Sequence, residues 1–140
     1  MSEALVTQWT ALGDKLVDLA EAFPGGHYDG RPTASVRSVA EQLRHVAFWN
    51  EFALQSLRGE PADGAANELP AAEFGTKAAI VRALRESFDA VTAELSRTGK
   101  PLADDADTAT AYVQHGAEHY GQLVVYARLR EIVPPASRDP

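Results

Sequence analysis

The feature that most constrains the fold is a set of four long segments with helical periodicity, separated by clusters of helix-breaking residues. The segments run from about Glu3 to Phe23, Ser38 to Leu57, Thr76 to Arg97 and Thr108 to Arg130. In each segment apolar side chains recur at intervals of three and four residues, which places them on one face of an α-helix. No segment alternates apolar and polar residues as a half-buried strand does. The sequence therefore predicts an all-α protein whose four helices bury their apolar faces against one another.

The boundaries of these segments are marked by residues that begin or end helices. Pro24-Gly25-Gly26 follows the first segment, and Thr98-Gly99-Lys100-Pro101 follows the third. Ser38 and Glu41 form a capping-box pattern at the start of the second. Residues 58–75 are rich in proline and glycine and predict a long connection between the second and third helices. We expect a four-helix bundle, in which a connection of this length allows a crossover.

Length and charge narrow the class of protein further. A chain of 140 residues is expected to form one domain, covering residues 1–140. The net charge of −7 and the lack of any Lys or Arg run argue against binding to nucleic acid or to anionic membranes. No apolar stretch approaches the roughly 20 residues that cross a bilayer. The N-terminus, Met-Ser-Glu-Ala, lacks the features of a signal peptide, so we expect a cytoplasmic protein.

Histidines provide the main candidate for a functional site. The chain has four histidines and no cysteine, so a metal site would use nitrogen and oxygen ligands. His115 and His119 are four residues apart on one helix, with Cβ atoms roughly 5–6 Å apart, and could share a cation at N–Zn distances of about 2.0–2.1 Å. His45, in the second segment, could add a third imidazole from a facing helix. Three protein ligands leave one position open, which is typical of a catalytic metal.

An ordinary structural interpretation competes with each of these assignments. A lone histidine is more often a half-buried polar residue bonded to a carbonyl or carboxylate, and this is the expectation for His27, in a loop. His45 has no local motif of its own. For His115 and His119 the shared helix face makes metal binding and simple hydrogen bonding comparable alternatives.

Other metal-site patterns fit the sequence poorly. Residues 115–119, HGAEH, match the H-x-x-E-H pattern of inverzincin proteases. Those enzymes take a further carboxylate ligand from a downstream segment, whereas Glu131 here lies at the end of the same predicted helix and cannot reach back. Glu118 is therefore expected to flank the site or face solvent. The Glu-x-x-His pairs of ferritin-like di-iron proteins are absent from the sequence.

Two further features have structural explanations. Asp104, Asp105 and Asp107 precede or open the fourth helix, where negative charge stabilises the positive end of the helix dipole. They lack the completed ligand loop of a calcium site. Trp9 and Trp49 are expected to be core anchors rather than substrate platforms.

Two segments resemble a known family. Residues 38–47, SVAEQLRHVA, resemble the second-helix signature of the DinB-like (YfiT-like) superfamily. Residues 115–136, HGAEHYGQLVVYARLREIVPPA, resemble its last-helix signature, a His-x3-His motif followed by Gly-Gln and a proline-rich end. The combination of His45, the His115–His119 pair and Gly121-Gln122 is more specific than any part alone.

The resemblance implies a four-helix bundle of the up-down-down-up type with a long crossover, often as a homodimer. It implies a divalent metal, often nickel or zinc, held by the three histidines that match His45, His115 and His119. Better-understood relatives include thiol-dependent transferases and isomerases that use bacillithiol or mycothiol, and many relatives have no assigned reaction. Despite the family's name, the resemblance does not imply DNA binding.

From the sequence we expect a metal-dependent enzyme, a thiol transferase or a hydrolase, acting on a small-molecule substrate such as a low-molecular-weight thiol. Irving–Williams ordering gives no firm choice between nickel and zinc. Gln122, Tyr126 and Tyr112 share the His115–His119 face, which is expected to look inward, and they could orient ligands or substrate. Ordinary core packing explains all three at least as well.

Two alternatives remain open at this level. One is a metal-binding or stress-related helical protein without turnover. The other is a structural bundle whose histidines are incidental. No residue stands out as a general base, because Glu41, one turn before His45, is equally well explained by its capping position.

Overall fold

The fold consists of four α-helices, as a computed structural model shows for residues 3–101, 103–104 and 106–140. The helices are α1 (Glu3–Ala22), α2 (Val39–Arg58), α3 (Lys77–Thr98) and α4 (Ala106–Arg128). Two single 3₁₀ turns accompany them, η1 (Gly25–His27) and η2 (Pro135–Ser137). The described residues contain no strand and no helix long and apolar enough to cross a membrane. The predicted all-α class and the four helical segments are therefore confirmed.

Most helix ends differ from the sequence predictions by one or two residues. The largest differences are in α4, which begins and ends two residues earlier than expected. Asp107 lies in the first turn of α4, where its charge suits the helix dipole, and Asp104 precedes the helix. Asp105 lies outside the described residues.

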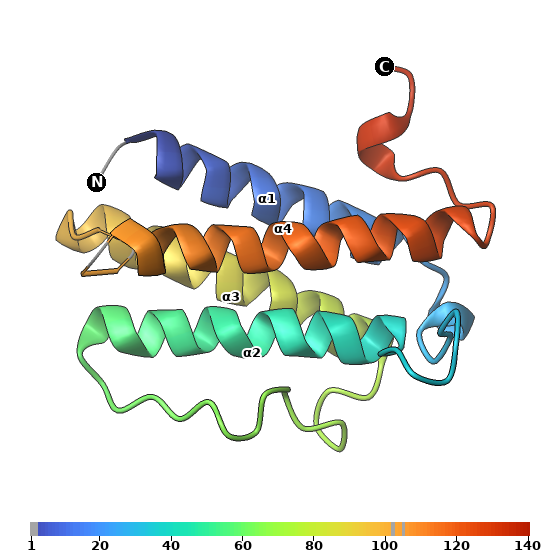
Figure 1. Cartoon of the computed structure of the whole chain (residues 1–140), viewed down its shortest axis with the longest axis horizontal. Helices are drawn as coiled ribbons and strands as arrows, with labels where there is room; N and C mark the ends of the chain where they lie inside the picture. The colour runs from blue at the N-terminus through green and yellow to red at the C-terminus, as the bar shows by residue number, and fades with distance from the viewer. Residues whose placement is uncertain (1–2, 102, 105) are drawn as a thin grey trace.

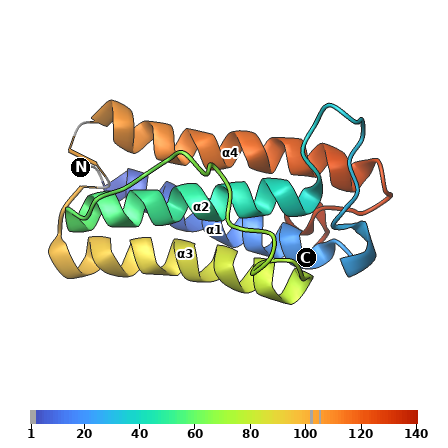
Figure 2. The ribbon, with the colours of Figure 1, turned by 90° about the horizontal axis from the view of Figure 1, so that it is seen from below.

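The helices run in the order up, down, down, up. In Figures 1 and 2, α1 and α4 point one way and α2 and α3 point the other. The helix pairs in extensive contact are α1–α3, α1–α4, α2–α3 and α2–α4, so α1 lies diagonally opposite α2. Because α2 and α3 are parallel, residues 59–76 must return along the whole bundle between them, as Figure 2 shows. The predicted crossover is this segment.

Local signals in the sequence fix where α2 begins. The Ser38 hydroxyl accepts a hydrogen bond from Glu41 N at 3.1 Å, and Glu41 Oε2 accepts one from Ser38 N at 2.7 Å. This reciprocal pair is the predicted capping box, and it satisfies two backbone N–H groups that the first helical turn leaves unpaired. Since His45 lies about two turns later, the cap also sets the position of that side chain along the bundle.

The core fills the space between the four apolar helix faces. Its fully buried large side chains come from every helix and from Phe23, just after α1; the helical ones are Trp9, Leu16, Leu19, Leu43, Ile80, Leu84 and Leu123. Trp9 packs against Phe88 with ring centroids 4.9 Å apart, which confirms its prediction as a core anchor. The same prediction for Trp49 is wrong. Trp49 is half-buried and lies beside His45 and His115, because its flank of α2 faces the crossover rather than the core.

Two glycines let α1 approach its neighbours closely. A Cβ on Gly13 would lie 2.9 Å from the Phe88 ring of α3, and a Cβ on Gly116 would lie 2.7 Å from Leu12 Cδ2. Gly116 directly follows His115, so the close contact with α1 lies behind the part of α4 that carries the histidine pair.

Candidate metal centre

Three histidines converge where α2 faces α4. His45 comes from α2, and His115 and His119 come from successive turns of α4. One ring nitrogen from each lies within 4.8 Å of the others. His27 lies in η1, outside this group. The structure thus brings together the three residues singled out in the sequence and separates them from the fourth histidine.

The other ring nitrogen of His45 is held by the crossover. His45 Nδ1 lies 2.6 Å from the backbone oxygen of Asn67. A carbonyl oxygen only accepts hydrogen bonds, so Nδ1 carries the proton and Nε2 of the neutral ring carries the lone pair. His45 is therefore oriented as a metal-binding imidazole usually is, with its second nitrogen donating to a fixed acceptor.

His119 is held in the same way by a side chain of α2. Its Nδ1 lies 2.7 Å from Gln42 Oε1, and Gln42 is only 1% exposed. With the amide oxygen placed toward the ring, Nδ1 donates and Nε2 of His119 is left with the lone pair. Asn67 and Gln42 thus each accept a hydrogen bond from the ring nitrogen that would not bind the metal. This is the interaction that normally fixes the orientation of a metal-binding histidine.

Asn67 is itself fixed by two features. Its φ is 60°, in the left-handed region that asparagine tolerates better than most residues. Its Oδ1 accepts a hydrogen bond from Trp49 Nε1 at 2.9 Å. The Trp49 indole therefore holds Asn67 in place, and Asn67 in turn orients the His45 ring.

Neither Gln42 nor Asn67 was identified from the sequence. Gln42 precedes His45 by three residues, so the i, i+3 relation placed it on the same flank of the helix and was a usable signal. No comparable signal existed for Asn67. Its contact depends on the path of an irregular connection, which only the tertiary structure defines.

Burial keeps the histidines neutral. It lowers the pKa of His119 to about 3 and that of His115 to about 4, with charge on the neighbouring histidines and Arg37 as smaller causes. The pKa of His45 is also lowered, mainly by burial, although its hydrogen bond to Asn67 acts in the opposite direction. At neutral pH all three rings are in the form that binds metal ions.

The spacing of the nitrogen atoms suits one shared ion. His45 Nε2 lies 2.9 Å from His115 Nε2. Two imidazole nitrogens on a tetrahedral metal, each about 2.0–2.1 Å from it, would be roughly 3.3 Å apart. Only a small adjustment separates the two arrangements. Within the described part of the chain no aspartate or glutamate joins the group, so the donor set consists of imidazoles, which suit zinc, nickel and copper.

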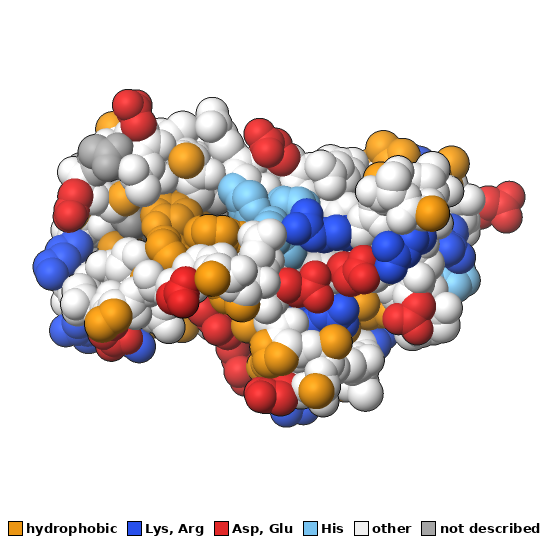
Figure 3. All heavy atoms as spheres, turned by 60° about the horizontal axis from the view of Figure 1, so that its bottom comes forward, with side chains coloured by type: hydrophobic (Ala, Val, Ile, Leu, Met, Phe, Trp, Pro, Cys, Tyr) orange, Lys and Arg blue, Asp and Glu red, His pale blue; other side chains and the backbone are white. Residues whose placement is uncertain are grey.

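The cluster is accessible from outside. His115 is half-buried, while His45 and His119 are buried. Figure 3 shows histidine side chains reaching the surface, with hydrophobic side chains on one side and a Lys or Arg side chain on the other. A ligand from solvent can therefore reach the histidines.

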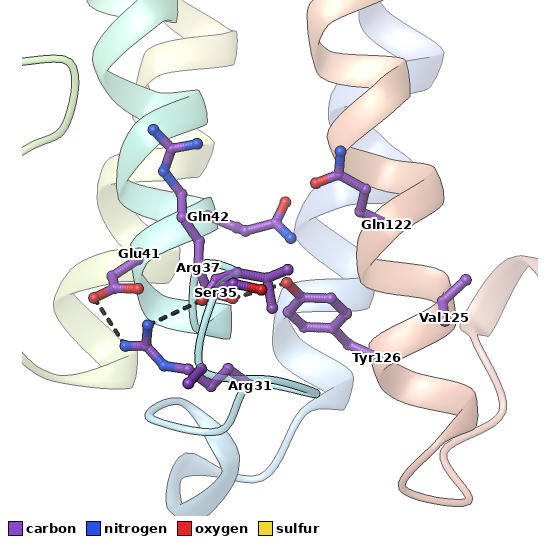
Figure 4. Close-up of a pocket in the computed structure, with 10 residues that line it drawn as sticks. Arg31, Ser35, Arg37, Glu41, Gln42, Gln122, Val125 and Tyr126 are labelled. Carbon is purple, nitrogen blue, oxygen red and sulfur yellow. Dashed lines mark hydrogen bonds and ion pairs between the residues drawn. The ribbon is translucent and has the colours of Figure 1, made fainter.

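Two of the three candidate lining residues lie together. Gln122 and Tyr126 line a cavity of about 690 Å³ that also includes Gln42 (Figure 4). The Tyr126 hydroxyl donates to the Arg37 backbone oxygen at 2.8 Å. Tyr112 is half-buried and lines a different cavity, about 570 Å³, near the C-terminal end of α2.

The inward orientation expected for this face of α4 is correct only in part. Tyr126 and His119 are buried, but Gln122 is exposed, because its turn of α4 borders the cavity instead of a neighbouring helix. Glu118 is exposed, as predicted when the protease pattern was rejected.

Comparison with known proteins gives the family. A sequence model of the DinB superfamily matches residues 8–123, a segment that includes α2, α3 and all three clustered histidines. A comparison with curated proteins gave no match. The matched segment covers well over half of the sequence, and the four-helix architecture agrees with the expectation drawn from the two signature segments. The chain therefore belongs to the DinB superfamily.

Proposed function

We propose that the protein is a divalent-metal-dependent enzyme, a thiol transferase or a hydrolase acting on a small molecule. Nickel or zinc would be held by His45, His115 and His119. The observation that carries the proposal is the convergence of three imidazole nitrogens within 4.8 Å, on rings that are neutral at physiological pH. Membership of the DinB superfamily supports metal binding, and the reaction class follows from the family resemblance.

Hydrogen bonds with neighbouring residues orient the histidines for metal binding. Asn67 and Gln42 accept hydrogen bonds from Nδ1 of His45 and His119, respectively. Nε2 of both rings is therefore left to bind the ion. A divalent metal held there would supply a Lewis acid that lowers the pKa of a thiol or a water molecule. Because the protein offers three ligands, a position would remain for a molecule from solvent.

The cavity beside Gln42 is the natural place for the substrate. Its walls include Gln122, whose amide is exposed and available for hydrogen bonding. The Tyr126 hydroxyl already donates a hydrogen bond to the Arg37 carbonyl oxygen. Tyr126 is therefore better suited to holding the segment before α2 than to contacting substrate. Of the sequence candidates, Gln122 is therefore the residue we assign to substrate orientation.

An activity assay on metal-loaded protein tests the proposal. Tag-free protein reconstituted with nickel or zinc would be given bacillithiol, mycothiol or glutathione with an electrophile such as 1-chloro-2,4-dinitrobenzene, and p-nitrophenyl esters without a thiol. We expect metal-dependent turnover that His119→Ala abolishes and that His27→Ala, a histidine substitution outside the cluster, preserves.

The alternatives give different outcomes. Stoichiometric metal without turnover of any substrate would contradict the enzyme assignment and favour a non-catalytic metal-binding protein. Turnover that persists in His119→Ala, or that does not depend on metal, would show that the histidine cluster is not the active site.

A further inference from the structure

The cavity beside the histidine cluster has the size and position of a substrate site. Its volume of about 690 Å³ lies within the range of small-molecule pockets. Its walls come from the segment before α2, the first turns of α2 and the last turns of α4 (Figure 4). Gln42 belongs to its lining and also binds His119 Nδ1 through Oε1 at 2.7 Å. Gln42 therefore connects the wall of the cavity to His119.

One positive charge on the cavity wall has no counter-ion among the residues that the structure describes. The charged residues lining the cavity are Arg31, Arg37 and Glu41. Arg31 pairs with Glu41 at 3.0 Å and also donates to the Val36 backbone oxygen at 2.9 Å, while Glu41 additionally caps α2. In the described residues, by contrast, the Arg37 guanidinium makes no hydrogen bond or ion pair. Arg37 differs from exposed cations such as Arg82 because it is half-buried and lines a cavity.

Arg37 is also placed to reach the histidine cluster. Figure 4 shows its side chain extending along α2 past Gln42 and away from Arg31. Gln42 is itself hydrogen-bonded to His119 Nδ1, so the Arg37 side chain extends toward the part of α2 that faces the cluster. The backbone beneath it is anchored, because the Arg37 carbonyl accepts the hydrogen bond from Tyr126.

The chemistry of the free guanidinium identifies the kind of ligand. A half-buried cation loses hydration without recovering it from a counter-ion, and a ligand anion would supply that interaction. The planar fork of arginine matches the two oxygens of a carboxylate or a phosphate. Apolar side chains on the same walls, Ala34, Val36 and Val125, suit an organic body attached to that group.

We propose that this cavity binds the anionic group of an organic substrate, a carboxylate or a phosphate, through the guanidinium of Arg37. The proposal rests on the proposed function in one respect: the bound molecule would present its reacting group to the histidine cluster. The anion contact itself requires only Arg37 and the cavity, so it can be tested with and without metal.

NMR titration of isotopically labelled protein tests the contact directly. Phenylacetate and phenyl phosphate would be added to metal-free and zinc-loaded protein, with phenylacetamide as the neutral counterpart. We expect saturable shifts of the Arg37 Nε–Hε signal with at least one anion and none with the amide. Comparing the two anions shows whether a carboxylate or a phosphate is preferred.

Substitutions separate a specific contact from general electrostatics. Arg37→Gln should weaken anion binding by roughly tenfold or more, the usual effect of losing a charge-assisted hydrogen bond. Arg82→Gln, which removes the same charge from an exposed position on α3, should leave binding unchanged. Folding should be preserved, because Tyr126 binds the Arg37 backbone rather than its side chain. Arg37→Lys, which keeps the charge and loses the fork, is a second variant.

Several results would overturn the proposal. They are the absence of saturable binding by either anion, equal binding of phenylacetamide, unchanged binding in Arg37→Gln, and equal weakening in Arg82→Gln. Binding that requires zinc but is indifferent to Arg37 would place the anion on the metal and also overturn it. Arg37-dependent binding in a protein that shows no metal-dependent activity would uphold this proposal while the proposed function fails.

Discussion

Two of the clustered histidines are each held through the ring nitrogen that faces away from the cluster. The acceptors differ in kind, a backbone carbonyl for His45 and a buried glutamine side chain for His119. Both fix the tautomer and the ring orientation before any ion arrives, which reduces the ordering required on binding. The geometry of the site therefore depends on residues that would never contact the metal.

Replacing one of these partners should weaken metal binding. Gln42→Met conserves side-chain volume but removes the acceptor from His119 Nδ1. We expect the dissociation constant for zinc to rise about 10- to 100-fold, the usual effect of losing such a partner, measured by competition with a chromophoric chelator. Gln122→Met is the matched control, because Gln122 lines the cavity without a hydrogen bond to any of the three histidines in the described structure. Equal affinities in both variants would contradict the role of Gln42.

Because the folded cluster resists protonation, the metal-free protein should lose stability in mild acid. Unfolded histidines take up protons below about pH 6.5, whereas His115 and His119 in the folded state do so only near pH 4 and 3. Between these values the unfolded state binds more protons, so the free energy of unfolding falls as pH falls from 7 to 5. Thermal unfolding across this range measures the effect. His119→Gln should show a shallower pH dependence than the wild type, and an identical slope would contradict the account.

At the scale of elements, the helices and the long connection between α2 and α3 were predictable, and the contacts of that connection were not. Strong breakers and the Ser38–Glu41 capping box delimit α2 in the sequence, so its face and length could be read directly. The parallel arrangement of α2 and α3 forces residues 59–76 to span the bundle, but no local pattern specifies where that segment touches α2. The contacts of Asn67 with His45 and Trp49 were therefore missed.

Helix packing around α1 gives a stability prediction. Gly13→Ala gains helix propensity but places a Cβ 2.9 Å from the Phe88 ring, so we expect a net loss of up to about 2 kcal/mol in the free energy of unfolding. Gly121→Ala, on α4 with nothing near its Cβ, should gain about 0.5–1 kcal/mol. Urea unfolding of the two variants makes the comparison. Equal changes in both would show that α1 and α3 are less tightly packed than the structure indicates.

The whole molecule combines a predictable architecture with a site that depends on its assembly. The helix faces and the long connection pointed to a bundle, and the two signature segments pointed to the up-down-down-up order that the structure has. The cavity lined by Arg37 and Gln122 could not be predicted, because its walls combine residues 31–42 with residues 122–126, which are far apart in the sequence. Arg37 lies in an irregular segment whose direction no periodic pattern reveals.

The homodimer implied by the family resemblance stays a prediction. Apolar side chains are exposed on and just after the last turns of α4, at Val125, Leu129 and Val133, and a second copy could cover them. Light scattering should then give about twice the 15.1 kDa chain mass, and Leu129→Glu should yield monomers. A wild-type protein that is monomeric at micromolar concentration would contradict this expectation.

Metal content tests the central claim most directly. Inductively coupled plasma mass spectrometry would measure the metal content per chain of tag-free protein. The wild type is compared with His45→Ala, His115→Ala and His119→Ala, and His27→Ala is the control outside the cluster. We expect about one nickel or zinc ion per chain in the wild type and the control, and loss of the ion in all three cluster variants. A wild-type protein that holds no metal even after reconstitution with nickel and zinc, or cluster variants that retain it, would contradict the account.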